Sequence, residues 1–315
     1  MSDDTGAPRR PASQEDELRE ALRAEARAVA GGSVRRLGRS HEAIFRPGIG
    51  RDLIVTFETE ARLEEADAGV VPTARHLAEV TDASWLCMVS EGATWFRDAA
   101  VFDFFDGLTD EGLFDEADAV LFMGAGAGGY AAAAYSVAAP GAAVIALRPQ
   151  ATLSAETAGW DARFFGARRR DFEGRYGYAP DMLEAAGQAM VLHDPEVEED
   201  AMHAALFRRE GVMRLRCRGL GYEIDEHLGS MGVLEPLAGS ALEGSLAEPL
   251  FWRLYRARRK HFGYLHALMR RTRDDGRLEF ARRVCRHGLE ATGRPFFRKR
   301  LESMEERLGR ITAAQ

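Results

Sequence analysis

The sequence has few cysteines and no long apolar run. Its three cysteines, Cys87, Cys217 and Cys285, are widely spaced and form no C-x-x-C pair. This spacing argues against a disulfide framework and against a structural zinc site, and it favours a reducing, cytoplasmic location. The N-terminus has no basic segment followed by an apolar one, and a Pro-Gly pair interrupts the longest mostly apolar run, 130–147. We therefore predict no signal peptide and no membrane span.

Positive charge is scarce over most of the chain. The 315 residues carry a net charge of −8, with 50 Asp+Glu against 42 Lys+Arg. Residues 251–315 nevertheless hold 18 Lys+Arg and 7 Asp+Glu, a net charge of +11, which leaves −19 for residues 1–250. This asymmetry favours docking of the basic segment on an acidic body, within one chain or between copies in a homo-oligomer. The acidic average argues against nucleic acid as a partner.

A hydrophobic content of 46% predicts one substantial core with a small appendage. Residues 1–13 are polar and aperiodic, which predicts disorder. We expect the main domain over 14–245, with an excursion over 151–188 that is rich in aromatic residues and arginines and resembles a cap. Helical stripes then predict a basic region of about three helices over 246–315.

Short apolar runs between turn residues predict an α/β fold with a doubly wound, mostly parallel sheet. Runs without alternation are typical of strands that are buried on both faces. The expected strands are 52–57, 84–90, 117–123, 143–147, 189–193 and 212–218, and the expected helices are 14–30, 72–80, 97–113, 130–139, 198–208 and 223–238.

The strand at 117–123 runs into a glycine-rich turn, GAGAGGY at 124–130, followed by alanines. Read as G-x-G-x-x-G, the turn fits a dinucleotide fingerprint, although the next strand ends in Arg148 rather than an acid, which would suit a 2′-phosphate. Read as G-x-S-x-G, it fits a nucleophile elbow with Gly126 where the Ser belongs. The turn follows the third predicted strand rather than the first, which favours the elbow.

The residues Gly128-Gly129-Tyr130 before a small-residue helix, with a strand ending in Arg148-Pro149-Gln150, resemble the elbow region of a branch of the α/β-hydrolase superfamily found near polysaccharide and glycosyltransferase genes. The resemblance covers about residues 51–234. It implies an α/β-hydrolase-like fold in which nucleophile, acid and histidine follow one another along the chain.

Two of these three positions lack the required group. The acid position holds Asp194, but the nucleophile position is Gly126 and the histidine position is Tyr222. A glycine has no atom with which to attack, so we expect no covalent acyl transfer. The oxyanion-hole loop, Glu58-Thr59-Glu60, would place carboxylates beside a developing negative charge and oppose it.

The segments RYGYAPDML, DAMHAALFRR and LYRARR also resemble bacterial proteins often labelled phosphoadenosine phosphosulfate reductase. That resemblance implies a turn with serines and a catalytic cysteine near the C-terminus. The turn here has no serine, and Cys285 falls inside a predicted helix, where a buried and inert thiol is the expectation. We therefore do not expect this activity.

The candidate ligand-binding groups lie at the carboxyl ends of the predicted strands. They are Gly124, Gly126, Ala127, Gly128, Gly129, Tyr130, Glu58, Ser90 and Arg148, with Gly126, Asp194 and Tyr222 as degenerate catalytic positions. We expect no metal, because the spacing of Asp194, Asp200 and His203 matches no zinc site.

Three hypotheses stay open. The first is a catalytically degenerate protein, without a cofactor, that binds a small molecule or a partner protein. The second is an enzyme that holds a nucleotide or NADP, with the N–H groups of Ala127, Gly128 and Gly129 as donors and Arg148 as counter-charge. The third is a weak hydrolase that acts through Asp194 and a water.

Overall fold

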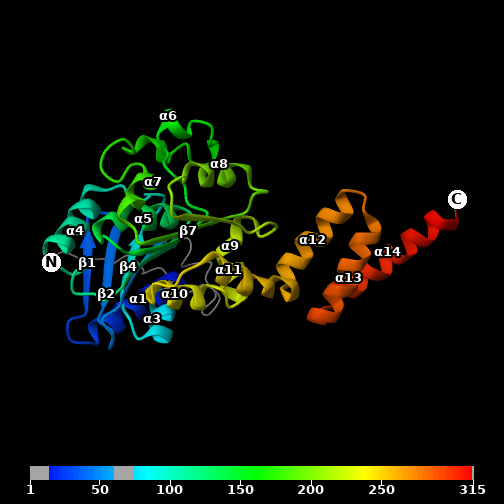
Figure 1. The fold of residues 1–315 in the computed structure, drawn as a ribbon, viewed down its shortest axis with the longest axis horizontal. Helices are drawn as coiled ribbons and strands as arrows, with labels where there is room; N and C mark the ends of the chain where they lie inside the picture. Colours follow the sequence, from blue (N-terminus) through cyan, green and yellow to red (C-terminus); the bar gives the residue numbers. More distant parts are fainter. Residues whose placement is uncertain (1–13, 60–73, 314–315) are drawn as a thin grey trace, which may run out of the picture.

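The computed structural model describes residues 14–59 and 74–313, and eight of the described segments form one sheet (Figure 1). The strand order is β1-β2-β4-β3-β5-β6-β7-β8. The first two pairings, β1 with β2 and β2 with β4, are antiparallel, and all the others are parallel. The strands are β1 (Ser33–Leu37), β2 (His41–Arg46), β3 (Leu53–Thr59), β4 (Ser84–Ser90), β5 (Val120–Ala125), β6 (Ala143–Leu147), β7 (Gln188–His193) and β8 (Val212–Arg216). The predicted mostly parallel α/β sheet is confirmed.

The sequence reasoning missed the two strands of the antiparallel edge. The glycine turn therefore follows the fifth strand, and its placement after the third is wrong. The reason is that charged residues hide the pattern: β2 contains Glu42, which is buried beside Arg19 (3.2 Å) and Arg23 (3.0 Å) of helix α1 (Gln14–Arg27). Only tertiary ion pairing makes this carboxylate compatible with a buried strand.

Helices cover both faces of the sheet, which confirms the doubly wound arrangement. On one face, α4 (Ala99–Asp110), α5 (Ala127–Tyr135) and α8 (Glu198–Leu206) enclose an aromatic core in which Phe57 stacks on Tyr135 at 5.6 Å. On the other face lie α3 (Ala74–Thr81), α9 (Ile224–Ser230) and α10 (Leu234–Leu242), with α1 beside β2. The helix predicted from 97 begins at 99, whereas residues 72 and 73, where the other helix was predicted to begin, lie outside the described part.

The excursion over 151–188 is present between β6 and β7 and contains only short helices, α6 (Ala155–Ala158), α7 (Ala179–Met182) and 3-10 turns. The buried Arg97 fixes it to the sheet domain by donating to the carbonyl oxygens of Asp171 (2.7 Å) and Arg175. The hydroxyl of Tyr130 donates to the carbonyl oxygen of Tyr176 at 2.5 Å. This segment is therefore bonded to the body through its backbone.

The C-terminal helices divide between two cores. Helix α11 (Glu248–Leu254) and the 3-10 segment Tyr255–Lys260 place Phe251 and Tyr255 in the core of the body. Helices α12 (Phe262–Asp274), α13 (Leu278–Thr292) and α14 (Pro295–Ala313) have a separate core, and they extend away from the sheet in Figure 1. We call these three helices the arm. The helical region predicted over 246–315 therefore divides between the two cores near residue 261.

The arm meets the body through its first helix. Arg271 of α12 pairs with Glu196, and the ring of His261, which caps α12, lies 5.0 Å from that of His227. Helices α13 and α14 project beyond this junction (Figure 1). The predicted docking of the basic segment on the body within one chain is thus observed for residues 251–260, whose Phe251 and Tyr255 lie in the body core, and for α12. Helix α13 contributes one further hydrogen bond, from the ring of His287 to the carbonyl oxygen of Arg259 (2.7 Å). No helix among the described residues is long and apolar enough to cross a membrane. The predicted disorder of residues 1–13 lies outside the described part.

Candidate functional site

The glycine turn joins β5 to α5 at the carboxyl edge of the sheet, the edge where the parallel strands end. Its vertex, Gly126, has φ 57° and ψ −120°, a conformation that costs little only for glycine. The N–H of Gly126 donates to Leu147 of β6 (2.9 Å), and its carbonyl accepts from Tyr130 (2.9 Å). The turn is therefore the sharp strand-to-helix bend of an elbow, and its vertex carries no side chain.

The other glycines of the turn allow close backbone packing. A Cβ on Gly128 would lie 2.2 Å from the carbonyl oxygen of Phe57, and one on Gly124 would lie 2.4 Å from that of Gly128. A Cβ on Gly129 would lie 2.8 Å from the carbonyl oxygen of Leu147. Contacts this short to backbone atoms leave no room for a methyl group, so α5 approaches β3 and β6 only because these positions are glycine.

Arg148, which follows β6, covers the elbow. A Cβ on Gly126 would lie 3.5 Å from both the Cζ and the Nη1 atoms of Arg148. The Nε atom of Arg148 is buried, and it has no hydrogen-bond partner in the described part of the chain. Its guanidinium lies beside the N-terminus of α5, where the first backbone N–H groups have no acceptor within the helix. Two sources of positive potential thus converge on this turn.

The other catalytic positions do not form a triad. Asp194, after β7, is buried and accepts from the backbone N–H groups of Gly221 (2.7 Å) and Glu196 (2.9 Å). Tyr222 is 52% exposed, with its ring 5.8 Å from the guanidinium of Arg163. Within residues 14–59 and 74–313, no histidine side chain hydrogen-bonds to Asp194. Asp194 therefore orders the two loops at its strand end.

Several predicted ligand contacts do not converge on the elbow. In the register of β3 and β4, Glu58 pairs with Val89 and Thr59 pairs with Ser90, so Glu58 and Ser90 point to opposite faces of the sheet. The Ser90 side chain is fully buried and its hydroxyl donates to Gly92. Tyr130 is also fully buried, with its hydroxyl bonded to the excursion. Glu60 lies outside the described residues.

The sequence reasoning missed a buried charge network next to the elbow. Arg163 donates to both oxygens of Asp161 and, at 2.7 Å, to Asp200 of α8. Asp200 interacts electrostatically with Arg148, and its second oxygen is buried without a hydrogen-bond partner in the described part. Burial, the largest cause, raises the pKa of this carboxyl. Only the D-x-R spacing of Asp161 and Arg163 could have signalled the network in the sequence.

His203 completes this network as a neutral base. Its Nδ1 accepts from the N–H of Ala151 (3.2 Å), so the proton lies on Nε2, which donates to Asp161 (3.1 Å). Burial lowers the pKa of His203 to about 4. Among the described residues, no group of three or more His, Cys, Asp or Glu side chains is arranged to hold a metal ion.

A strained segment after β4 was also missed. Trp95 and Phe96 have φ values of 49° and 56°, which are uncommon for bulky residues. The indole N–H of Trp95 donates to Gln150 (3.2 Å), and its ring packs edge-on against Phe164 at 4.7 Å. Nothing in the sequence signals positive φ at consecutive aromatic residues.

Cys285 is buried in α13 as expected, and burial raises the pKa of its thiol to about 11.

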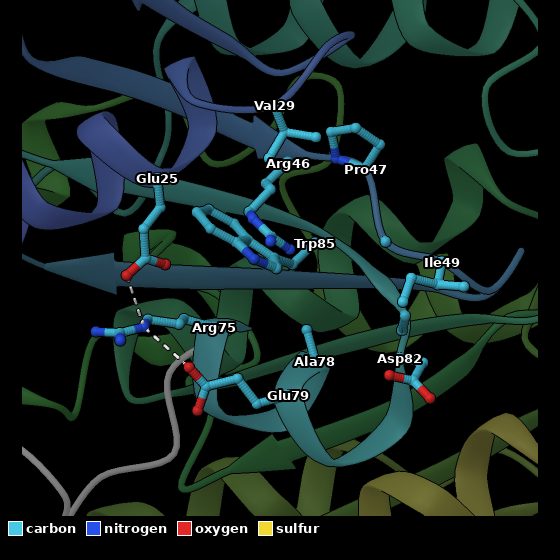
Figure 2. Close-up of a pocket in the computed structure, with 12 residues that line it drawn as sticks. Glu25, Val29, Arg46, Pro47, Ile49, Arg75, Ala78, Glu79, Asp82 and Trp85 are labelled. Atoms are coloured by element: carbon cyan, nitrogen blue, oxygen red, sulfur yellow. Dashed lines mark hydrogen bonds and ion pairs between the residues drawn. The ribbon is translucent and has the colours of Figure 1, made fainter.

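A hollow of about 430 Å³ lies at the opposite edge of the sheet (Figure 2). Its walls come from α1, α3, the end of β2 and the start of β4, where Trp85 lies. Arg75 bridges Glu25 (3.0 Å) and Glu79 (3.2 Å) across one side of it, as Figure 2 shows. Because this hollow is at the amino ends of the parallel strands, it is separate from the elbow.

Comparison with known proteins gives fold-level similarity only. No family model matches the sequence, and no curated protein matches it. Among solved structures, an esterase of Pyrobaculum calidifontis is 15% identical with a TM-score of 0.41, covering 76% of this chain and 96% of its own. The capsule O-acetyltransferase of Neisseria meningitidis serogroup A is 11% identical with a TM-score of 0.45, covering 67% and 95%. Brefeldin A esterase, a bacterial protein, is 15% identical with a TM-score of 0.41, covering 76% and 89%.

The fold assignment rests on the sheet itself. A mostly parallel sheet with helices on both faces, and a sharp strand-to-helix turn after a central strand, make this an α/β-hydrolase-like fold.

Proposed function

We propose that this α/β-hydrolase-like protein holds a small anionic ligand over the elbow without forming a covalent intermediate. The observation that carries the proposal is the position of Arg148: its guanidinium lies 3.5 Å from the point where a nucleophile's Cβ would begin at Gly126. A cation therefore occupies the space in which a serine hydroxyl would stand. Such a turn can bind an anion but offers no atom for acyl transfer.

The chemistry of the turn selects a carboxylate or a phosphate. The free N–H groups of Ala127 and Gly128 at the start of α5 supply donors and the positive end of the helix dipole. Arg148 adds a planar fork that matches two oxygens of an anion. A nucleotide, including NADP, belongs to this ligand class because of its phosphates. Asp200, close enough to interact with Arg148, would oppose a ligand of high negative charge.

Thermal shift measurements with inorganic phosphate, acetate, AMP and NADP test this proposal. A ligand at a hundred times its Kd should stabilise the protein by about 2.7 kcal/mol and raise the Tm. Arg148→Gln should abolish the shift because it removes the cation. Arg51→Gln is the matched control, since Arg51 forms an exposed pair with Asp118. Equal shifts in both variants, or no shift with any of these anions, would contradict the proposal.

Weak hydrolysis through Asp194 and a water is the competing function. Asp194 lies at the carboxyl edge, but both of its oxygens accept backbone N–H groups, which hinders its use as a base. We expect no labelling by a fluorophosphonate and no turnover of p-nitrophenyl acetate above that of Asp194→Asn. Covalent labelling, or turnover that Asp194→Asn removes, would favour the hydrolase instead.

A further inference from the structure

A second hollow lies between α8 and the last two strands of the sheet. It has a volume of about 650 Å³, within the range of small-molecule sites. Strand β8 is the last in the strand order, so this hollow is at the edge of the sheet. Helix α8 faces it with Ala201, Ala204 and Ala205, whose small side chains leave the space unfilled. We call it the α8–β8 pocket.

The sheet wall of the α8–β8 pocket carries two unpaired arginines. In β8, Leu215 is buried in the core of one face, so Arg214 and Arg216 project from the other. Within the described part of the chain, no carboxylate lies within ion-pair distance of Arg214 or Arg216. The neighbouring arginines outside the pocket are paired, Arg209 with Glu184 (3.3 Å) and Arg218 with Glu196 (3.5 Å).

His193 of β7 forms the inner part of the same wall. It pairs with Arg216 in the register of β7 and β8, which puts both side chains on one face. The side chain is only 6% exposed, and its Nδ1 atom is buried without a hydrogen-bond partner among the described residues. A buried polar atom without a partner is costly, so a ligand group toward which the His193 ring can turn would stabilise it. Burial lowers the pKa of His193 to about 4, so the ring is neutral near neutral pH.

We propose that the α8–β8 pocket binds the carboxylate or phosphate group of a small organic molecule, held by Arg214 and Arg216 and hydrogen-bonded to His193. The two guanidinium groups supply the charge, and the imidazole supplies one donor and one acceptor. Glu248 at the rim already accepts from the indole N–H of Trp252 (2.7 Å). This site is independent of the elbow, because none of the residues that line it belongs to the glycine turn.

Histidine NMR on the full chain tests the site at the level of single residues. Inorganic phosphate and acetate are titrated separately at constant ionic strength, and the imidazole signal of His193 is assigned by its loss in His193→Gln. We expect a saturable shift of this signal with at least one anion, and the more tightly bound anion identifies the ligand class. The absence of a saturable shift with both anions would overturn the proposal.

Variants then assign the contacts. Arg214→Gln and Arg216→Gln should each weaken binding about tenfold, the usual effect of losing one charge-assisted hydrogen bond. The double variant should lose saturation, and Arg209→Gln, whose partner is Glu184, should match the wild type. Equal affinity in the double variant would mean an adventitious ion only and would overturn the proposal. Arg148→Gln should leave the His193 titration unchanged, which separates this site from the elbow.

Discussion

At the residue scale, two glycines of the same turn are required for different physical reasons. Gly126 is needed for its backbone conformation, whereas Gly128 is needed because α5 lies against the carbonyl of Phe57. The first constraint is met without strain only by glycine, and the second fixes helix packing. Substitutions at these two positions should therefore fail for different reasons.

Alanine substitutions distinguish these constraints. Gly128→Ala should lower the free energy of unfolding by about 3 kcal/mol or more, because its Cβ would lie 2.2 Å from a backbone oxygen. Gly126→Ala should cost about 1–2 kcal/mol, the cost of a left-handed conformation. Gly107→Ala, in α4 with open space around it, should raise stability by up to about 1 kcal/mol. Urea denaturation measures all three, and equal losses at 126 and 128 would contradict the assignment.

Buried histidines predict how stability depends on pH. Burial lowers the pKa values of His41, His193 and His203 to about 4, below the unfolded value of about 6.5. Between these values the unfolded chain binds more protons, so stability should be complete above about pH 6.5 and fall toward pH 4. Each histidine contributes a slope of up to about 1.4 kcal/mol per pH unit. Asp200 and Asp52, whose pKa values burial raises, act in the opposite direction but are two groups against three.

Chemical denaturation at about pH 5 and about pH 7 measures this slope. His203→Gln should reduce the slope, whereas Arg51→Gln should not, because it removes only an exposed ion pair and no histidine. The His203 variant is also expected to be less stable at about pH 7, since it loses the bond to Asp161. A slope that is the same in wild type and His203→Gln would refute the assignment of His203 as a buried neutral base.

The sequence predicted the turn and its neighbours well, because glycines and apolar runs report local backbone demands. Gly126 and Arg148 were both identified from the residues alone, and the structure brings them within contact distance. The network around Arg163 was not predictable, because its partners Asp161 and Asp200 meet only after the excursion folds over α8. Charge that is neutralised by tertiary contacts leaves no periodic signal.

At the element scale, a buried arginine helps to attach the excursion over 151–188 to the body. Arg97 precedes α4, donates to two carbonyl oxygens of the excursion and lies 4.6 Å from the ring of Phe102. The aromatic and arginine composition suggested a cap but gave no indication of this attachment, because a carbonyl acceptor is independent of side-chain type. The missed strands β1 and β2 show the same limit, since α1 supplies the partners of Glu42.

Replacing Arg97 should release the excursion. Arg97→Gln removes the charge, and the shorter side chain cannot donate to the carbonyl oxygens of Asp171 and Arg175. We therefore expect the free energy of unfolding to fall by about 3 kcal/mol and tryptic cleavage within 163–175 to be faster. Arg51→Gln should change neither, because its pair with Asp118 is exposed on both sides. Cleavage of the Arg97 variant at the wild-type rate would mean that the other contacts of the excursion, such as the Tyr130–Tyr176 and Arg163–Asp200 bonds, hold it without Arg97.

At the scale of the whole molecule, the C-terminal helices belong to two hydrophobic cores, one in the body and one in the arm, that meet near residue 261. Phe251 is fully buried in the body, and Tyr255 is 2% exposed there. The arm core begins with α12 and includes Met269 and Phe297. The basic composition changes at about residue 251, but the physical boundary lies about ten residues later, where the packing partner changes. Charge and packing therefore place the boundary differently.

Two truncations test this boundary. Ending the chain after Lys260 removes the arm, its contacts through Arg271 and His261, and Tyr264, which is partly buried against the body core. It should lower the stability of the body by about 2 kcal/mol or less, because exposed ion pairs contribute little and only one apolar side chain is lost. Ending it after Leu250 also removes Phe251 and Tyr255, which leaves a cavity in the body and should cost at least about 3–5 kcal/mol. Denaturation of both truncated chains provides the measurement. If the shorter chain is as stable as the longer one, Phe251 and Tyr255 belong to the arm, as the charge distribution alone would suggest.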